Sequence, residues 1–325
     1  MNRRRLAALA LALPLLHAAR TALAQAAPWP TRTVRLIVPF AAGGTADVLA
    51  RIMAERLTQR WGQQVVVENR PGAGGNIGAE QVARAAGDGH TLLLGTIGIH
   101  AASAIYSNLP YRPATDLAPV TVLAEMPNAI IVHPSVAART LPELIALAKR
   151  EPGQLSFGSA GSGSSTHLAG ELFMLSTGTR MVHVPYRGSA AALNDLLGGS
   201  IQVMFENLPT VPPLAQANQV RVLAVTSAEA VPALPGTPAA QDAGAPGYVA
   251  TAWMTLAAPG TIPEALLTRI NDDVRAVLAE EAVRSRLVSL GAIPIGGTVQ
   301  QSRDFFAEET VKWNRVIEAA GIRVN

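Results

Sequence analysis

Apolar positions along the chain follow two different spacings. Short β-branched apolar runs predict strands at VRLIVPF, QVVVENR, HTLLLGT, AIIVHPS, LSFGSAG, MVHVPY, IQVMFEN and VRVLAVTS. Between most of these runs the apolar residues recur every three or four positions, which predicts amphipathic helices; one example is formed by Leu49, Ile52, Met53 and Leu57. Near-continuous apolar strands that alternate with helices indicate an α/β fold, with parallel-rich sheets that carry helices on both faces.

Two segments share one design, in which a strand leads through a loop of small residues into a helix: RLIVPFAAGGTADVLARIM and QLSFGSAGSGSSTHLAGELF. A chain of 325 residues is long enough for about two domains, and each segment would begin one of them. Ligands bind outside the carboxyl ends of parallel strands, so two such domains would form a ligand cleft between their facing loops. After about Pro263 the pattern predicts helices, and the last of these carries Phe305, Phe306 and Trp313.

Residues 1–24 have the layout of a secretory signal peptide. A tri-arginine start is followed by an apolar stretch at 6–16 and by the small-residue sequence Ala22-Leu23-Ala24. A membrane anchor would need roughly 20 apolar residues, and a proline, a histidine and an arginine interrupt this segment. The sequence therefore predicts an exported, periplasmic protein that is cleaved near Ala24.

Removal of this leader changes the charge of the protein. The leader holds four of the 26 basic residues and none of the 23 acidic ones, so the formal charge falls from +3 to about −1. This balance lacks the basic footprint of a nucleic-acid-binding protein, and no nucleic-acid partner is expected. The chain has no cysteine, which excludes disulfides and a thiol nucleophile. Its 49% hydrophobic content predicts a well-packed globular protein.

The glycine-rich loops do not match the nucleotide-binding motifs. A P-loop ends in Gly-Lys-Ser/Thr, but the two lysines, Lys149 and Lys312, do not follow a glycine. A dinucleotide fingerprint fails as well, because Gly72 and Gly74 are followed by Ile77 where the third glycine belongs. No nucleotide or other cofactor is expected.

The loop after the first strand has the chemistry to hold a carboxylate. Small residues let backbone N–H groups approach a ligand closely, and a helix N-terminus adds unpaired donors at the positive end of the helix dipole. Asp47 either caps these N–H groups or acts on the loop or on a ligand ammonium group. Phe40 either walls the ligand or packs in the core. The candidate ligand-binding residues of this loop are Phe40, Ala42, Gly43, Gly44, Thr45 and Asp47.

The second loop adds hydroxyl groups to the same design. Ser164 or Ser165 is either a ligand contact or the N-cap of the next helix. The strand IQVMFEN ends in polar residues and is positioned to present Asn207 to the cleft. Neither loop contains Lys or Arg, and Arg187 is the nearest candidate cation. The candidate ligand-binding residues of this part are Ser159, Ala160, Gly161, Ser164, Thr166 and Asn207.

No catalytic motif accompanies these loops. The nucleophile elbow G-x-S-x-G does not occur, and the histidines lack the H-x-H, H-x-x-H and H-E-x-x-H spacings. We therefore expect neither a catalytic residue nor a metal. The alternative is an exported α/β hydrolase that acts on a small ester or amide, with Ser164 or Thr166 as nucleophile and His167 as base. Turnover distinguishes the two, because a receptor returns its ligand unchanged.

Six segments, taken in order, carry a family resemblance: WPTRTVRLIVPFAAGGTADVLAR, VVVENRPGAGGNIGAE, GHTLLLGT, FGSAGSGSSTHLAGELF, HVPYRGSAAALNDLLGGSIQVMFEN and RVLAVTS. Together they closely resemble the substrate-binding proteins of tripartite tricarboxylate transporters, the Bug-type receptors. Each motif alone is weak, but the ordered set covers essentially the whole chain after the leader.

The resemblance implies a periplasmic binding protein of the Venus flytrap type, in which two α/β domains close on a small organic acid or amino acid. Its topology assigns 29–123 plus 227–325 to one domain and 124–226 to the other. It implies that backbone N–H groups and waters at Phe40–Thr45 hold the ligand carboxylate, and that Ser159–Thr166 holds the other end. It also implies membrane subunits of a transporter as partners, or a sensor role without them. Nothing in the sequence requires more than a monomer.

Overall fold

The structure is a computed structural model, and it describes residues 29–323 of the chain. The predicted signal peptide, 1–24, lies outside the described residues. The chain divides into two units after Thr31, and Arg32–Asn325 form one compact unit, to which the following description refers.

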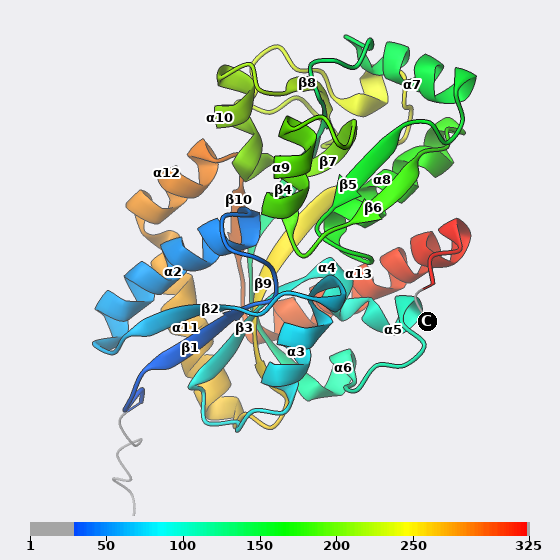
Figure 1. Ribbon diagram of the computed structural model, residues 1–325. Coiled ribbons are helices and arrows are strands. Elements are labelled where there is room, and N and C mark those ends of the chain that lie inside the picture. Colours follow the sequence, from blue (N-terminus) through cyan, green and yellow to red (C-terminus); the bar gives the residue numbers. More distant parts are fainter. Residues whose placement is uncertain (1–28, 324–325) are drawn as a thin grey trace, which may run out of the picture. The chain divides into compact units, whose positions relative to one another are not determined.

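Strands and helices alternate along most of this unit (Figure 1). The strands are β1 (Val34–Val38), β2 (Val65–Asn69), β3 (Thr91–Thr96), β4 (Leu117–Val132), β5 (Ser156–Ser159), β6 (Val182–Pro185), β7 (Val203–Asn207), β8 (Arg221–Val225), β9 (Thr251–Pro259) and β10 (Ile293–Gly296). The helices are α2 (Thr45–Trp61), α3 (Asn76–Ala83), α4 (Ile97–His100), α5 (Ala102–Ile105), α6 (Pro113–Asp116), α7 (Leu141–Arg150), α8 (Ser165–Thr177), α9 (Ser189–Leu197), α10 (Val211–Gln216), α11 (Glu264–Ala279), α12 (Glu281–Ser289) and α13 (Val299–Ala320). Short 3₁₀ turns lie at η1 (Ala73–Gly75), η2 (Leu208–Thr210) and η3 (Ala240–Asp242).

The strands form a mixed sheet in the order β2-β1-β3-β9-β4-β7-β5-β6, and β8 and β10 also pair with β4. The outer strands pair in parallel, as the alternating pattern predicts: β1 with β2 and β3, and β5 with β6 and β7. The central strands β4 and β9 pair antiparallel with each other, and β9 also pairs antiparallel with β3. The long β4 is thus shared by both halves of the sheet, because its first part pairs with β9 and its last part with β7 and β8.

Helices cover both faces of the sheet around β7. Successive strand residues point to opposite faces, and Phe205 packs in a cluster with residues of α7 and α8, whereas Met204 packs in a cluster with residues of α9. This two-sided burial explains the continuous apolar run of β7. The run ends in Glu206 and Asn207, so polar side chains appear at the carboxyl end of the strand.

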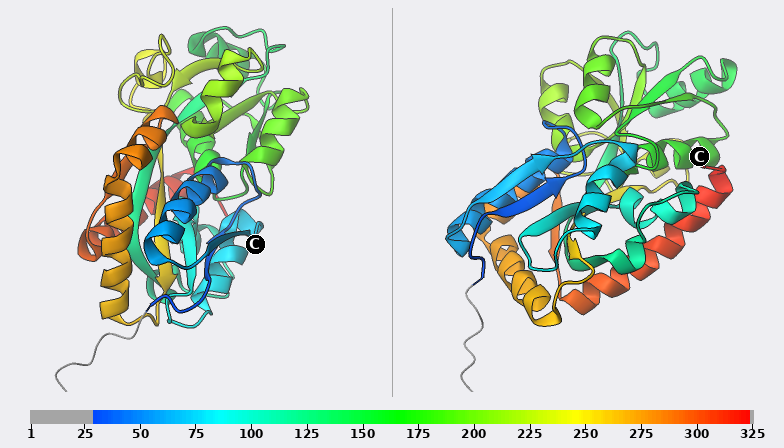
Figure 2. Two further views of the ribbon diagram at one scale, coloured as in Figure 1. Left: turned by 90° about the vertical axis from the view of Figure 1, so that its left-hand side faces the viewer. Right: turned by 60° about the horizontal axis from the view of Figure 1, so that its bottom comes forward.

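The other half of the sheet has its own core, in which Ile37 of β1, Leu93 of β3 and Ala257 of β9 pack with Val82 of α3. Three C-terminal helices complete this half. As Figure 2 shows, α11 packs beside α2, whereas α13 packs beside α4, α5 and α8. The amphipathic pattern predicted after Pro263 therefore corresponds to helices that cover the sheet.

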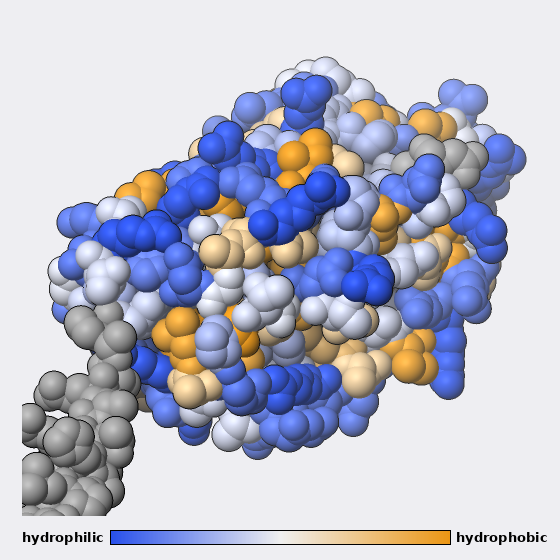
Figure 3. All heavy atoms as spheres, turned by 90° about the horizontal axis from the view of Figure 1, so that it is seen from below, coloured by the Kyte–Doolittle hydropathy of each residue, from blue (hydrophilic) through white to orange (hydrophobic). Residues whose placement is uncertain are grey.

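Side chains on the face of the molecule shown in Figure 3 are mainly hydrophilic, and the apolar ones lie in small separate groups. Single exposed apolar residues are normal for a protein surface. Among residues 29–323, no helix combines the length and the apolar character that a bilayer crossing requires.

Candidate functional site

Three helix N-termini meet at one small cavity. Helix α2 begins after Gly44, α8 begins after Ser164, and α9 begins after Gly188. The cavity has a volume of about 20 Å³, which is room for about one water molecule. Its lining residues come from these helix starts, from the carboxyl ends of β3 and β7, from the loops after β1 and β5, and from β9: Phe40, Gly44, Thr45, Ala46, Thr96, Ala160, Ser164, Ser165, Ser189, Asn207 and Met254.

The lining provides hydrogen-bond donors and no charged side chain. The first N–H groups of a helix have no partner within the helix, and the helix dipole makes this end positive. At Gly44 and Gly188 the N-cap has no side chain to satisfy them. The Thr45 and Thr96 side chains are 3% and 2% exposed, and neither hydroxyl has a hydrogen-bond partner in the described part of the chain. Such a set of unpaired donors is suited to an anion of carboxylate size.

The predicted site residues fall into two groups. Some line the cavity: Phe40, Gly44, Thr45, Ala160, Ser164 and Asn207. The others lie outside the lining: Ala42, Gly43, Asp47, Ser159, Gly161 and Thr166. Most residues of the second group form hydrogen bonds that fix the conformation of the two loops. They therefore position the lining residues without lining the cavity themselves.

Asp47 fastens the first loop to the body of the protein. Its carboxylate accepts hydrogen bonds from Gly43 N at 3.0 Å, from Arg51 at 2.9 and 3.0 Å and from Asn69 Nδ2 at 3.0 Å. Asn69 Nδ2 also donates to Phe40 O at 3.0 Å. Burial opposes the ionisation of Asp47, but these hydrogen bonds outweigh it and lower the pKa of the carboxyl. The oxygens of Asp47 are therefore engaged within the protein.

The second loop is fixed in a similar way by hydroxyl groups. Ser159 Oγ lies 2.6 Å from His183 Nε2 and accepts a hydrogen bond from Gly161 N at 3.1 Å. Thr166 Oγ1 accepts a hydrogen bond from Ala160 N at 2.9 Å. These bonds hold the loop against β6 and α8, so Ser159 and Thr166 set the position of Ala160 at the cavity wall.

The geometry around His167 gives no support to the hydrolase alternative. His167 Nδ1 accepts a hydrogen bond from Gly163 N at 3.0 Å, and Nε2 lies 3.3 Å from a carboxylate oxygen of Glu171. Ser164 Oγ instead accepts from the backbone N–H of His167 at 3.3 Å and lies 3.1 Å from Thr166 Oγ1. A hydroxyl nucleophile needs a base within hydrogen-bond reach. Both ring nitrogens of His167 are directed elsewhere.

Metal ligands are not gathered at this site either. Within residues 29–323, no group of three or more His, Cys, Asp or Glu side chains is arranged to hold a metal ion.

Several cavity residues do not appear among the sequence candidates: Ala46, Thr96, Ser189 and Met254. Ser165, which the sequence offers as an alternative to Ser164, also lines the cavity. Ser189 could have been predicted from the sequence. MVHVPYRGSAAALNDLL is a third segment in which a strand leads through a glycine-serine turn into a helix. Thr96 is the last residue of a predicted strand, where a polar side chain meets the carboxyl edge. Met254 lies on β9, which the apolar pattern does not predict.

Arg187 lines a larger neighbouring cavity of about 620 Å³, which is lined also by Gly161 and Ser162 of the second loop and by residues 71–74, and which shares Ala160 with the small cavity. Tyr106 lines it as well. Arg187 is therefore outside the lining of the donor-lined cavity.

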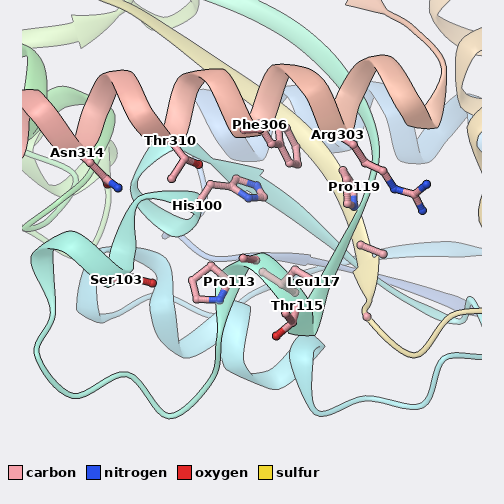
Figure 4. A pocket seen from close by; sticks show the side chains of 14 residues that line it. His100, Ser103, Pro113, Thr115, Leu117, Pro119, Arg303, Phe306, Thr310 and Asn314 are labelled. Carbon is pink, nitrogen blue, oxygen red and sulfur yellow. The ribbon is translucent and has the colours of Figure 1, made fainter.

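A separate cavity of about 510 Å³ lies under α13 (Figure 4). The rings of His100 and Phe306 contact each other there in a tilted arrangement with centroids 4.1 Å apart, and burial lowers the pKa of His100 to about 3. Arg303 is the cation in its lining, and it forms an ion pair with Glu264 at 2.8 Å. None of the predicted site residues lines this cavity. Its paired cation and neutral histidine are less suited to an anion than the three helix N-termini.

Donors at facing helix N-termini on a mixed α/β scaffold suit several classes of anion-binding protein, among them the solute-binding receptors. The family model "Tripartite tricarboxylate transporter family receptor" matches residues 49–322. Protein BugT of Bordetella pertussis is 36% identical over 299 residues, which cover 91% of this chain and 91% of that protein. The chain therefore belongs to the tripartite tricarboxylate transporter receptor family, and the resemblance read from the motifs is confirmed.

Solved structures agree with this assignment. A Rhodopseudomonas palustris protein with adipate has a TM-score of 0.88 and 41% identity, and the match covers 91% of this chain and 100% of that chain. The periplasmic binding protein BugD has a TM-score of 0.87 and 32% identity, with coverage of 91% and 100%. MatC from the same Rhodopseudomonas species, with bound malate, has a TM-score of 0.83 and 33% identity, with coverage of 89% and 100%.

These relatives settle the fold class and the class of function. The fold is the mixed α/β fold of periplasmic binding proteins, as the sequence predicts. The chain is a solute-binding receptor of the transporter family rather than an enzyme, because that family consists of receptors.

Proposed function

We propose that this receptor captures a small organic acid by its carboxylate in the cavity at the N-termini of α2, α8 and α9. The observation that carries the proposal is a pair of buried hydroxyls, Thr45 Oγ1 and Thr96 Oγ1, which have no partner among residues 29–323 and lie beside two helix N-termini without a side-chain cap. These donors recognise a carboxylate without a cation. The adipate and malate bound by relatives are acids of this kind.

A small acid needs more space than this cavity offers, since pockets for small molecules usually measure about 300–1,000 Å³. We propose that 29–123 plus 227–325 form one domain, that 124–226 form the other, and that the two separate to admit the ligand. Contacts across this division support a closed arrangement: Tyr106 Oη donates to Ser162 O at 2.8 Å, and Ala41 N donates to Arg187 O at 3.1 Å. These two hydrogen bonds would break when the proposed domains separate.

A thermal screen tests the proposed function. The purified protein is heated with adipate, malate, other mono-, di- and tricarboxylates, and amino acids. An acid at about a hundred times its dissociation constant should add roughly 2.7 kcal/mol of stability, which is a shift of several degrees in the midpoint of unfolding. The methyl esters of the same acids are the matched controls, because they keep the shape and lose the charge. Equal shifts with acids and esters would contradict carboxylate recognition.

We propose that the receptor works in the periplasm as a monomer and delivers its ligand to membrane subunits of a tripartite transporter. The apolar stretch and the Ala22-Leu23-Ala24 end of the leader support export. Periplasmic extracts of expressing cells should contain a chain that begins near Gln25, as read by N-terminal sequencing. A full-length chain recovered in the membrane fraction would refute cleavage at this position.

A further inference from the structure

Glu206 is a fully buried acid at the edge of the proposed site. It is 0% exposed and precedes Asn207, the last residue of β7, which lines the cavity. Its Oε1 accepts a hydrogen bond from Thr210 Oγ1 at 3.0 Å. Its Oε2 has no hydrogen-bond partner in the described part of the chain. A buried carboxylate with one unpaired oxygen is costly to ionise.

The groups around this carboxyl do not compensate a negative charge. Burial raises the pKa of Glu206 to about 7, and the Thr210 and Ser189 hydroxyls and the Asn207 N–H offset burial only in part. All of these groups are uncharged, and no ion pair of Glu206 is present within residues 29–323. The carboxyl is therefore poised between its neutral and ionised forms near neutral pH.

Charged groups on the neighbouring elements are engaged elsewhere. On α9, Asp195 accepts a hydrogen bond from Tyr186 Oη at 2.6 Å. At the start of α2, Asp47 is paired with Arg51. On β8, Arg221 donates to backbone carbonyls that follow β4. These ion pairs and hydrogen bonds leave the Glu206 carboxyl with hydroxyl and backbone partners only.

Ser189 connects Glu206 to the cavity. Ser189 lines the cavity, and its hydroxyl is one of the groups that partly offset the effect of burial on the pKa of Glu206. It also faces the first loop, because a methyl group added at Gly44 would lie 3.5 Å from Ser189 Cβ. A group that acts on Glu206 therefore lies in the wall of the proposed carboxylate site.

We propose that Glu206 couples carboxylate binding to the uptake of one proton. This inference rests on the proposed function. An ionised Glu206 and a ligand carboxylate would place two negative charges in one desolvated site, where they repel each other. Protonation of Glu206 removes one of these charges, so binding of the ligand carboxylate favours the protonated form of Glu206. The receptor thus binds an acid more tightly at low pH than at high pH.

Calorimetric titration tests the coupling directly. The probe is the acid that gives the largest shift in the thermal screen, titrated between pH 6 and pH 8.5, where a simple carboxylic acid is itself ionised throughout. The parent should lose affinity about 30-fold over this range, because pH 8.5 is about 1.5 pH units above the pKa of about 7 and each unit above that pKa costs up to tenfold. In two buffers of different ionisation enthalpy at pH 8, binding should take up close to one proton per ligand.

Glu206→Gln keeps a neutral hydrogen-bonding group at all pH values, so its affinity should vary less than twofold over the same range and take up no proton. Glu229→Gln is the matched control, because Glu229 is an exposed carboxylate whose pKa does not enter the proposal; it should keep the pH dependence of the parent. Tight binding by the parent with flat affinity and no proton uptake would overturn the inference alone. Failure of every acid to bind at any pH would overturn the proposed function and the inference with it.

A second measurement needs no ligand. The folded protein raises the pKa of Glu206 from 4.5 to about 7, so it holds a proton that the unfolded chain releases as pH rises through this window. The contribution of Glu206 to the free energy of unfolding is therefore most favourable at low pH. It decreases as the pH rises toward the pKa of Glu206 in the folded protein. The unfolding midpoint of the parent should therefore fall relative to Glu206→Gln between about pH 5 and pH 8. Parallel curves for the two proteins would overturn the inference.

Discussion

Replacement of Thr45 or Thr96 by valine should weaken carboxylate binding at least tenfold without loss of protein stability. Valine keeps the branched shape of threonine and removes only the hydroxyl. In the protein without ligand neither hydroxyl has a partner among the described residues, so its removal exposes no unsatisfied group and should leave stability unchanged or slightly raised. In the complex, each hydroxyl would donate to a charged oxygen, and such a bond is worth about 1.5–3 kcal/mol. That loss corresponds to a tenfold or larger increase in Kd.

Calorimetry and thermal unfolding on the same preparations measure the two effects. The double variant Thr45→Val/Thr96→Val should lose about a hundredfold or more in affinity if the two hydroxyls reach different oxygens. Thr177→Val is the matched control with the opposite pattern: its Oγ1 donates to Phe173 O at 2.7 Å far from the cavity lining, so stability should fall by about 1 kcal/mol and affinity should not change. Parent-like affinity in both single variants would refute the donor-lined site.

The repeated strand, small-residue loop and helix is the part of the site that the sequence predicts well. The design requires few residues at fixed spacing, and a helix that follows such a loop must leave N–H groups unpaired at its start. Gly44 and Ser164 were identified in this way, and both line the cavity. The third helix start, at Ser189, follows the same rule and was missed because its turn is shorter and its strand is half exposed.

Loop positions alone do not tell which side chain faces a cavity and which faces the protein. Asp47 and Ser159 belong to the right loops, yet their polar atoms are bonded to Arg51, Asn69 and His183. Arg51 lies four residues after Asp47 on the same helix, whereas Asn69 and His183 lie on other elements and are distant in sequence. The sequence shows the donors that a loop contains, whereas tertiary contacts decide which donors remain unpaired.

The central strands were the least predictable part of the fold. The apolar run at 129–135 marks only the end of β4, which begins at Leu117. Its earlier part contains the β-branched run Val120-Thr121-Val122, but two prolines and an acid interrupt the pattern, and β9 is rich in alanine, so the strand signal of both is weak. Both form strands because they pair with each other along most of their length, and this non-local pairing leaves no periodic signal in the sequence.

Gly98→Ala should weaken ligand binding at least tenfold by keeping the proposed domains apart. Gly98 lies in α4, and a Cβ at this position would lie 2.1 Å from Gly163 O and 2.9 Å from Gly163 C. Real Cβ contacts are longer than 3.0 Å, so the loop at 161–164 must move by about 1 Å. The backbone of Gly163 cannot yield as a flexible side chain would, and overpacking of this kind costs typically 1–3 kcal/mol.

That strain arises only in the closed arrangement, because Gly98 and Gly163 lie in different proposed domains. The stability of the protein without ligand should therefore change little, since opening relieves the clash. The free energy of ligand binding should become less favourable by the added cost of closure. An added cost of about 1.4 kcal/mol corresponds to a tenfold loss of affinity. Small-angle scattering with saturating ligand should give a larger radius of gyration for Gly98→Ala than for the parent.

Gly198→Ala is the matched control for this substitution. Gly198 has a helical backbone with φ −79°, and an added Cβ would meet its nearest atom, Asn194 O, at 3.4 Å, an ordinary contact distance. Both changes add one methyl group at a glycine with an ordinary φ, and only Gly98 faces the other proposed domain. Gly198→Ala should bind and compact like the parent. Equal affinity and equal compaction in Gly98→Ala would show that ligand binding does not require α4 and the 161–164 loop to meet, and the two-domain closure would then be wrong.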